Sequence, residues 1–300
     1  MADLHLDFID YKKLFGDREK RLQLIDKLSF IPTVPYLKLV YWIKTGRRLN
    51  LKKPRTFSEK LNWLKIHDIH EEYTKYVDKY AMKVHVSENY GPEYVIPMLG
   101  VWDSFDDINF ESLPESFVLK CTHDSGSIKI IKEKATMDKA ALKRFFDGRM
   151  RINPYNMGRE YPYRNVKPRI IAEEFYTSEA GQLISDCKFY CFNGSARLMY
   201  TVSGRGEREK ENWFDMELNP VDIIDPTSPV TSDSYDIPMR FEEMKQFAES
   251  LSKNTKFVRV DLYYNNERFY FGELTFFPFG GFLLLKPEKW ESKLGTWITL

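Results

Sequence analysis

Two carboxylates face each other across a predicted β-hairpin in residues 259–277 (RVDLYYNNERFYFGELTFF). Aromatic and β-branched runs flank a short polar turn at residues 265–267, which is the pattern of an antiparallel strand pair. Because side chains alternate along a strand, we expect Asp261 and Glu273 nearly opposite each other, within roughly 5 Å at Cβ. Facing carboxylates repel unless a cation lies between them. The hairpin therefore predicts a cation site, or else an exposed pair of charged strand positions.

A second candidate is the segment KCTHDSGS, residues 120–127, between two predicted strands. Lys120 ends the first strand, and a turn of small residues with Gly126 follows. Small residues let backbone N–H groups close on an anion, and a lysine adds a point charge, so the loop can hold a phosphate. The segment matches neither a P-loop nor a dinucleotide-binding fingerprint. An ordinary hairpin turn explains it at least as well.

The composition fits a globular protein with a sizeable core. The chain has 300 residues, and its 45 Lys and Arg against 44 Asp and Glu give no overall field that favours nucleic acid. Aromatic residues make up 15% of the chain, which fits sheet-rich structure and a carbohydrate-facing surface. Cys121, Cys187 and Cys191 give neither a disulfide framework nor paired CxxC spacing, so we expect buried, reduced thiols.

Location follows from the same features. Reduced thiols indicate the cytosol, and the first residues lack the apolar segment of a secretory signal. Residues 30–44 are apolar but broken by Pro32 and Pro35, so we favour a helix that packs on the core over one that lies on a membrane. The basic run 46–55 can meet anionic lipid or polysaccharide, or simply be solvated. We expect a cytoplasmic protein, with peripheral contact to the inner face of the membrane and to membrane-bound assembly machinery left open.

These candidates need elements to position them. The chain predicts a helical first 75 residues, with Ser58 as one N-cap, and a helix that ends near Gly91. Strands are expected in residues 94–102, on both sides of the loop 120–127, and in 170–177, 184–193 and 196–204, the last leading into a charged loop, 205–213. Further helices are expected at 138–150 and 241–253. This order predicts an α+β chain of two or three lobes.

The order of these features resembles the ATP-grasp superfamily. The motif sequences are most similar to those of its teichuronopeptide-biosynthesis (TupA-like) branch, which is found in gene clusters for surface polysaccharides. The similar phrases are TFSEKLNWLKIHD, DKYAMKVHVSENYGPEYVIPMLGVWD, LPESFVLKCTHDSGS, GREYPYRNVKPRIIAEEFY, DCKFYCFNG and the hairpin with GELTFFPFGG. The resemblance implies an ATP-grasp fold, with the nucleotide between two antiparallel-sheet lobes. It implies four parts: a helical extension, 1–75; a pre-grasp region, 76–110; a central lobe, 111–175; and a C-terminal lobe, 176–300.

The resemblance also implies an ATP site. Its residues would be Lys79 and Lys120 at the α- and β-phosphates, His123, Ser125, Gly126 and Ser127 in a lid loop, Glu173, Glu174 and Phe175 at the adenine and ribose, and Asp186 at the ribose or in a structural role. The cation between the hairpin carboxylates would be Mg²⁺ bridging ATP oxygens.

Two catalytic roles and one departure accompany the metal. Arg259 would neutralise charge as the γ-phosphoryl group moves, and Lys188 would act in catalysis. ATP-grasp enzymes usually place Asn two residues after the metal-binding Glu, where this chain has Thr275. A hydroxyl can bind Mg²⁺ or a ligated water, so the number of metal ions stays open.

Substrate residues are expected in three loops. Arg159, Glu160 and Tyr163 precede the hinge, Arg205 and Arg208 lie in SGRGERE, and Gly280 and Gly281 follow the hairpin, where relatives hold a substrate carboxylate with backbone amides. We expect the basic residues to bind an acyl phosphate or an anionic sugar. A solvated loop explains Arg205 and Arg208 equally well.

The resemblance implies a carboxylate–amine ligase that works through an acyl phosphate and attaches an amino acid or amine to a uronic acid of a bacterial surface polysaccharide or its precursor. One alternative is a glycosyltransferase that uses a nucleotide sugar, although DFID and FDDIN are the nearest approaches to its DxD motif. Another is a binding module whose ATP site has decayed, against which the retained lysines and carboxylates argue. Release of ADP, of UDP or of neither distinguishes the three.

Overall fold

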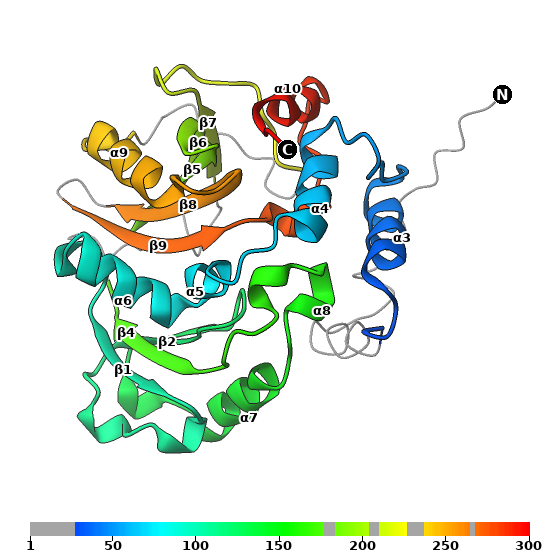
Figure 1. Ribbon diagram of the computed structural model, residues 1–300. Coiled ribbons are helices and arrows are strands. Elements are labelled where there is room, and N and C mark those ends of the chain that lie inside the picture. The colour runs from blue at the N-terminus through cyan, green and yellow to red at the C-terminus, as the bar shows by residue number, and fades with distance from the viewer. Residues whose placement is uncertain (1–27, 177–183, 204–209, 227–236, 265–267) are drawn as a thin grey trace.

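The computed structural model describes residues 28–176, 184–203, 210–226, 237–264 and 268–300. Two antiparallel sheets lie one above the other (Figure 1). The four-stranded sheet has the order β1-β4-β2-β3, with β1 Met98–Trp102, β2 Phe117–Cys121, β3 Ile128–Ile131 and β4 Ile170–Glu174. The five-stranded sheet has the order β7-β6-β5-β8-β9, with β5 Ser185–Phe192, β6 Ser195–Ser203, β7 Lys210–Phe214, β8 Phe257–Tyr264 and β9 Phe269–Thr275. The α+β class is confirmed.

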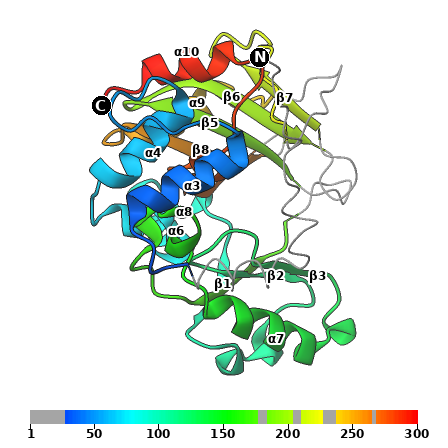
Figure 2. The ribbon, with the colours of Figure 1, turned by 90° about the vertical axis from the view of Figure 1, so that its right-hand side faces the viewer.

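Helices cover both sheets and one side of the molecule (Figures 1 and 2). They are α3 Thr33–Thr45, α4 Phe57–His67, α5 Tyr73–Val77, α6 Lys79–Asn89, α7 Lys139–Met150, α8 Tyr155–Gly158, α9 Phe241–Ser252 and α10 Lys289–Trp297. Helix α7 lies under the four-stranded sheet and α9 on the five-stranded sheet, while α3 lies at the periphery (Figures 1 and 2). Within the described residues, no helix is both long and apolar enough to cross a bilayer.

Side-chain alternation along β2 decides which residues face the other sheet. Phe117 and Leu119 belong to a buried cluster with Leu142 and Phe146 of α7. The intervening side chains point the other way, and the ammonium group of Lys120 lies 5.9 Å from the ring of a tyrosine on β8. The packing of α7 thus directs Lys120 toward the five-stranded sheet.

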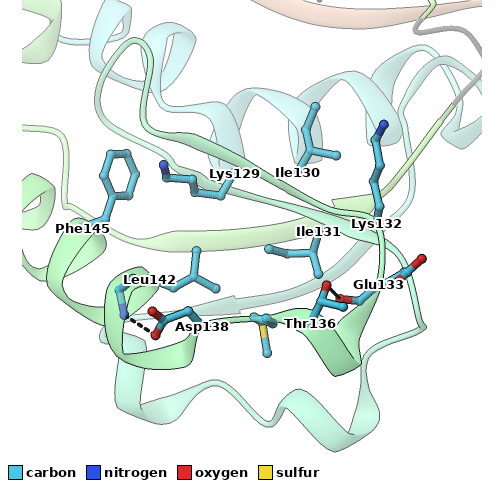
Figure 3. A pocket seen from close by; sticks show the side chains of 11 residues that line it. Lys129, Ile130, Ile131, Lys132, Glu133, Thr136, Asp138, Leu142 and Phe145 are labelled. Carbon is cyan, nitrogen blue, oxygen red and sulfur yellow. Dashed lines mark hydrogen bonds between the residues drawn. The ribbon is translucent and has the colours of Figure 1, made fainter.

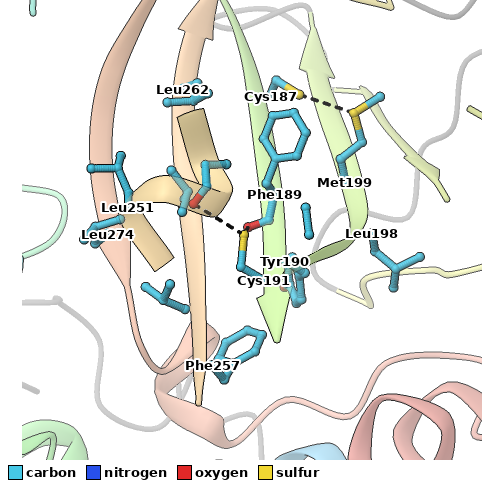
Figure 4. Packing of buried hydrophobic residues seen from close by; sticks show 14 of the residues in the cluster. Cys187, Phe189, Tyr190, Cys191, Leu198, Met199, Leu251, Phe257, Leu262 and Leu274 are labelled. Carbon is cyan, nitrogen blue, oxygen red and sulfur yellow. Dashed lines mark hydrogen bonds between the residues drawn. The ribbon is translucent and has the colours of Figure 1, made fainter. Parts of the chain in front are cut away.

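The same alternation acts on β5. Cys187 and Cys191 are buried on the face covered by α9, where the Cys191 thiol lies 3.9 Å from the Ala248 carbonyl oxygen (Figure 4). The expected burial of these thiols is confirmed. Lys188, one residue from Cys187, lies on the opposite face and so points away from α9.

Two local expectations are wrong. The N-cap of α4 is Thr56, not Ser58, because Glu59 lies three residues after Thr56 and completes a capping box with it. Residues 210–214 are not part of a charged loop but form β7, which pairs with β6 and buries Trp213 and Phe214. Within the predicted helical region 1–75, the described residues form α3, α4 and the start of α5, with residues 46–56 between α3 and α4. Residues 1–27 lie outside the described part of the chain.

Candidate functional site

Helix α6 begins at the site because Asp78 caps it. The Asp78 carboxylate accepts hydrogen bonds from the backbone N–H groups of Tyr80 (2.9 Å) and Ala81 (3.3 Å). It also accepts one from Arg169 at 2.7 Å. Lys79 is therefore the first helical residue, and Lys83 follows it on the same helix face, one turn later.

The second lysine of this pair is part of a buried charge cluster. Lys83 Nζ lies 3.1 Å from Glu173 Oε1, and Lys120 Nζ donates to Glu173 Oε2 at 2.5 Å. Lys83 and Glu173 are each 1% exposed. Glu173 on β4 and Lys120 on β2 reach each other because their strands are neighbours in the sheet.

The pKa values of the three groups follow from burial and mutual attraction. Burial opposes the charged form of Glu173, but the two ammonium groups outweigh it and lower the pKa of Glu173 to about 2. Burial also disfavours the charged form of Lys120, yet attraction to Glu173 raises the Lys120 pKa above its ordinary value. For Lys83 burial dominates, and its pKa is lowered. Together with Lys79, these groups form a surface of α6, β2 and β4 that we call the lysine wall. It carries three lysines and one carboxylate, which leaves positive charge to bind an anion.

The loop between β2 and β3 is held from below by α7. Asp124 forms a buried ion pair with Arg149 and accepts a hydrogen bond from Ser127, while Arg149 donates to the Ser125 carbonyl oxygen at 2.9 Å. Above the loop, Lys79 Nζ donates to the Asp124 carbonyl oxygen at 2.5 Å. The loop conformation is thus tied to the first residue of α6.

Two more residues of this loop have defined positions. Gly126 adopts a positive φ of 79°, which few other residues tolerate. His123 is buried beneath the loop, 3.3 Å from the Arg149 carbonyl oxygen, and burial lowers its pKa. Burial thus favours the neutral form of the His123 side chain.

The hairpin has the expected register, with Asp261 on β8 directly opposite Glu273 on β9. In the structure, the Asp261 carboxylate is bound by two cations. Arg259 donates to both of its oxygens, at 2.6 and 2.7 Å, and Lys188 donates to Oδ2 at 2.5 Å. Arg259 also donates to Thr275 Oγ1 at 3.2 Å. Arg259 and Lys188 therefore reduce the repulsion expected between the two carboxylates.

The other carboxylate of the pair is more open. Glu273 lies 3.7 Å from Lys79 Nζ and 3.8 Å from Arg259 Nη2, and its side chain is 36% exposed. Burial opposes the charge of Asp261, but Arg259 and then Lys188 outweigh it and lower the Asp261 pKa. Lys79 of the α6 wall and the hairpin of the five-stranded sheet thus meet at Glu273.

The donors at the hairpin fit a hard cation only in part. Asp261, Glu273 and Thr275 supply oxygen atoms on one face, which are the ligand atoms that Mg²⁺ prefers. Within the described ranges, no group of three or more His, Cys, Asp or Glu side chains gathers in a metal-binding arrangement. A metal ion here would take its other ligands from water and phosphate, as Mg²⁺ commonly does.

The predicted hinge residues lie at the end of β4 and at the start of β5. Glu174 is the last residue of β4, and its N–H donates to the Pro97 carbonyl oxygen at 3.1 Å. Phe175 follows it, and then Tyr176, whose ring packs on Tyr270 of β9 with centroids 5.0 Å apart. Asp186, buried at the start of β5, is 1% exposed. The contacts of these residues to adenine and ribose stay predictions.

The glycine loop after β9 is fixed by polar side chains of α4. Lys65 donates to the Gly280 carbonyl oxygen at 2.5 Å, and Asn62 donates to that of Gly281 at 2.6 Å. Gly280 and Gly281 both have positive φ, 65° and 68°, and a Cβ on Gly281 would lie 3.3 Å from Leu61 Cβ. The glycines are required by backbone conformation and by close approach to α4.

Charged groups also gather beside this loop. Glu160 would lie 3.5 Å from a Cβ placed on Gly280. Burial lowers the pKa of Lys65 to about 7, although attraction to Glu160 opposes this, and burial raises the pKa of Glu160. Burial raises the pKa of Tyr163, and the nearby carboxylates of Glu160 and Glu273 raise it further. The predicted substrate residues Glu160, Tyr163 and Gly280 therefore lie in one region next to the hairpin.

Arg159 lies apart from this region. Its guanidinium donates to the carbonyl oxygens of Leu28 (3.0 Å) and Ile31 (3.2 Å) and stacks 4.2 Å from the ring of Tyr36. It is 2% exposed and joins the segment before α3 to the residue after α8. A substrate contact of Arg159 stays a prediction, and Arg205 and Arg208 lie outside the described residues.

Three site residues were not identified from the sequence. Lys83 had a signal, since it lies four residues after Lys79 in a predicted helix. Arg149 and Lys65 had no such signal, because their partners are distant in the sequence. Arg149 lies 25 residues from Asp124, and Lys65 lies 215 residues from Gly280. A separate groove of about 450 Å³ lies between β3 and α7, with Ile130, Leu142 and Phe145 in its lining (Figure 3). None of the predicted site residues lines it.

Comparison with known proteins adds a family. A family model described as TupA-like ATPgrasp matches residues 59–299. No curated protein matches the chain. Similar solved structures include the ATP-grasp ligase PsnB with a minimal precursor (9% identity, 68% of this chain and 54% of that chain, TM-score 0.40). Others are D-alanine–D-alanine ligases from Bacillus anthracis (15%, 74% and 66%, 0.44) and Helicobacter pylori (10%, 82% and 68%, 0.43). The chain thus spans 54% to 66% of the first two structures.

Proposed function

Because the chain belongs to the TupA-like ATP-grasp family, we propose that it is an ATP-dependent carboxylate–amine ligase. One observation carries the proposal. Three lysines of α6 and β2 line one wall against a single carboxylate, Glu173, and the Asp261–Glu273 pair stands on the opposite sheet. Lys79 contacts both the loop and the hairpin, at Asp124 and Glu273. This arrangement suits a polyanion held between two sheets with a divalent cation.

The wall would bind the phosphates of ATP. Lys79 and Lys120 are the groups whose charge is directed toward the second sheet, and the loop 123–127 would cover the phosphates with backbone N–H groups. Lys120 and Lys83 together keep Glu173 ionised, and Glu173 in turn holds the Lys120 ammonium group in place. The backbone of Glu174 and Phe175 at the hinge would contact the adenine, with Asp186 near the ribose.

The hairpin would hold magnesium through Asp261, Glu273 and the Thr275 hydroxyl. When bound, the metal ion supplies neutralisation of phosphate charge. For Asp261 to serve as a ligand, Lys188 and Arg259 must release at least one of its oxygens. Phosphate oxygens are the natural new acceptors for both cations, so these residues would move from the carboxylate to the transferring group.

The reaction is two successive group transfers. The γ-phosphoryl group of ATP moves to a carboxylate oxygen, which gives an acyl phosphate and ADP. An amine nitrogen then attacks the acyl carbon, loses its proton to solvent, and inorganic phosphate leaves with the bonding electrons of the C–O bond. Arg259 and Lys188 stabilise negative charge during the first step, and the enzyme mainly positions the reactants.

The substrates are inferred from the family and from the region beside Gly280. We propose a uronic acid as the carboxylate and an amino acid, peptide or amino sugar as the amine, in the synthesis of a capsule, O-antigen or teichuronopeptide. Tyr163, Glu160 and the loop 280–281 are the residues placed to contact them. We place the reaction in the cytoplasm, where ATP is available.

Thermal unfolding with Mg·ATP, together with ADP release, tests the proposal. We expect Mg·ATP to raise Tm by several degrees and the Glu273→Gln variant to lose this shift. Glu242→Gln, at an exposed carboxylate of α9, is the matched control and keeps it. A shift with a UDP-sugar alone would point to glycosyl transfer. No shift with either ligand would contradict a nucleotide site.

A further inference from the structure

The outer face of α3 is apolar although it is exposed. Val34, Leu39, Trp42 and Ile43 are 39%, 43%, 53% and 39% exposed. Val34, Lys38 and Trp42 form one row at four-residue spacing, and Leu39 and Ile43 lie in the adjacent row. Phe30, just before the helix, is 79% exposed. Large apolar side chains on one exposed helix face mark an interaction surface.

This helix is fixed to the body of the protein. Its inner face buries Tyr36, Leu37 and Tyr41 in a cluster with Phe282, which confirms that it packs on the core. Arg159 binds the carbonyl groups that precede the helix and stacks on Tyr36. The outer face is therefore presented by a rigid element and not by a loosely attached helix.

The charge of this region is one-sided. Residues 28–58 contain seven Lys and Arg and no Asp or Glu, in a chain whose net charge is +1. Arg47 is paired with Glu288, at 2.7 and 2.9 Å. Five further cations are exposed and form no ion pair with a described residue: Lys38, Arg48, Lys52, Lys53 and Arg55. A partner for this region should therefore carry negative charge.

We propose that α3 and residues 46–55 bind an anionic phospholipid bilayer. A helix at a bilayer surface buries Trp, Leu and Ile by roughly 5–10 Å, while nearby Lys and Arg meet the headgroups. The exposed face of α3 has this composition, with Trp42 as the residue suited to the interface. Bilayer binding goes beyond the ligase reaction and does not depend on it, whereas delivery of an acceptor to the glycine loop rests on the proposed function.

The position of α3 gives this contact a use. Phe282, in the cluster beneath α3, directly follows the glycine loop of the proposed acceptor region. One helix diameter, about 10 Å, thus separates the lipid-binding face from that loop. Binding to the bilayer would bring an acceptor carried on a membrane lipid close to Gly280 and Gly281.

The test is cosedimentation of the full chain, without nucleotide, with vesicles made of equal parts phosphatidylglycerol and phosphatidylcholine. We expect binding at low salt, weaker binding as salt rises, and little binding to vesicles of phosphatidylcholine alone. Replacing both Lys52 and Lys53 with Gln should weaken binding roughly 25-fold, at about fivefold for each cation. The control replaces Lys132 and Lys139, exposed near α7, with Gln and should bind normally.

Fluorescence identifies the face that enters the bilayer. The emission of the wild type should shift to the blue on binding, and Trp42→Phe should lose most of that shift while it still sediments with vesicles. An unchanged Tm shows that each variant is folded. Absence of binding to anionic vesicles at low salt, or equal weakening by the control substitutions, would overturn the proposal. Binding to soluble polygalacturonate without binding to vesicles would overturn it in favour of a polysaccharide partner.

Discussion

Glu173 and its two lysines should respond unequally to substitution. Glu173→Gln leaves Lys83 and Lys120 buried without a counter-charge, so we expect a loss of about 3–5 kcal/mol in the free energy of unfolding. Lys83→Met keeps the Glu173–Lys120 pair and a similar side-chain volume, so the loss should stay below about 1.5 kcal/mol. Urea denaturation measures both. Equal losses would contradict the idea that one carboxylate serves two cations.

A second carboxylate, Glu211 on β7, predicts a pH dependence of stability. Burial, helped by Asp225, raises the pKa of Glu211 from 4.5 to about 7. Between these values the unfolded chain releases the proton and the folded protein keeps it, so stability falls as pH rises from 4.5 to about 7 and is then constant. Glu211→Gln keeps the acceptor for Trp213 and removes this fall.

The Glu211→Gln variant should therefore be more stable than the wild type above about pH 7, by at most roughly 3 kcal/mol, and unchanged below pH 4. Chemical denaturation across this pH range measures the difference. A variant that is less stable above neutral pH would show that Glu211 is ionised and paired in the folded protein.

Lys188 should restrict access of metal to the hairpin when no nucleotide is present. It donates to Asp261 Oδ2 at 2.5 Å, so it competes with a divalent cation for this oxygen. We expect Lys188→Met to bind Mn²⁺ several-fold more tightly than the wild type without nucleotide, as measured by the electron paramagnetic resonance signal of free Mn²⁺. The same variant should lose turnover. Lys210→Met, at an exposed lysine of β7, should change neither property.

At the scale of elements, two aspartate caps offer a matched comparison. Asp78 caps α6, which carries Lys79 and Lys83, whereas Asp138 caps α7 through the N–H of Ala141 at 2.9 Å. Each substitution with Ala should cost about 0.5–2 kcal/mol of stability through the lost cap. Asp78→Ala also loses the pair with Arg169, so its cost should be larger.

Of the two caps, only that of α6 should affect the affinity for Mg·ATP. Fraying of the first turn moves Lys79 from the loop and from Glu273, so Asp78→Ala should weaken Mg·ATP affinity at least tenfold. Asp138→Ala should leave the affinity unchanged. Isothermal titration calorimetry measures both, and equal affinities for the two variants would show that the helix cap does not position Lys79.

Local patterns predicted the elements better than the contacts between them. The alternation in the hairpin predicted that Asp261 faces Glu273, because register is fixed wherever one sheet face is buried. Lys83 was not predicted, although its four-residue spacing from Lys79 in a predicted helix is a sufficient signal. The contact of Lys65 with Gly280 spans 215 residues, and the pair of Arg149 with Asp124 joins a helix to a distant loop, so neither follows from a periodic pattern. Strand β7 was not predicted, because its charged residues are typical of a loop and its pairing with β6 leaves no local pattern.

Across the whole molecule, helix α4 contacts the C-terminal part of the chain beside the candidate site. Helix α4 holds the glycine loop through Asn62 and Lys65, and Ser58 at its start donates to Glu291 of α10 at 2.8 Å. The segment before α6 thus fixes the C-terminal sheet region against which the substrate would bind. The match to the family model also begins within α4, at residue 59.

The distribution of charge over the two sheets predicts which part of ATP dominates binding. The lysine wall formed by α6, β2 and β4 carries three lysines and one carboxylate, Glu173, and phosphate is the group that offsets the remaining positive charge. We expect Mg·tripolyphosphate alone to raise Tm by several degrees and adenosine alone to raise it little. Because Lys79 and Lys120 are partly accessible, the shift should decrease as salt is raised. A larger shift with adenosine than with tripolyphosphate would show that the hinge provides most of the affinity, and that the lysine wall acts mainly to orient the phosphates.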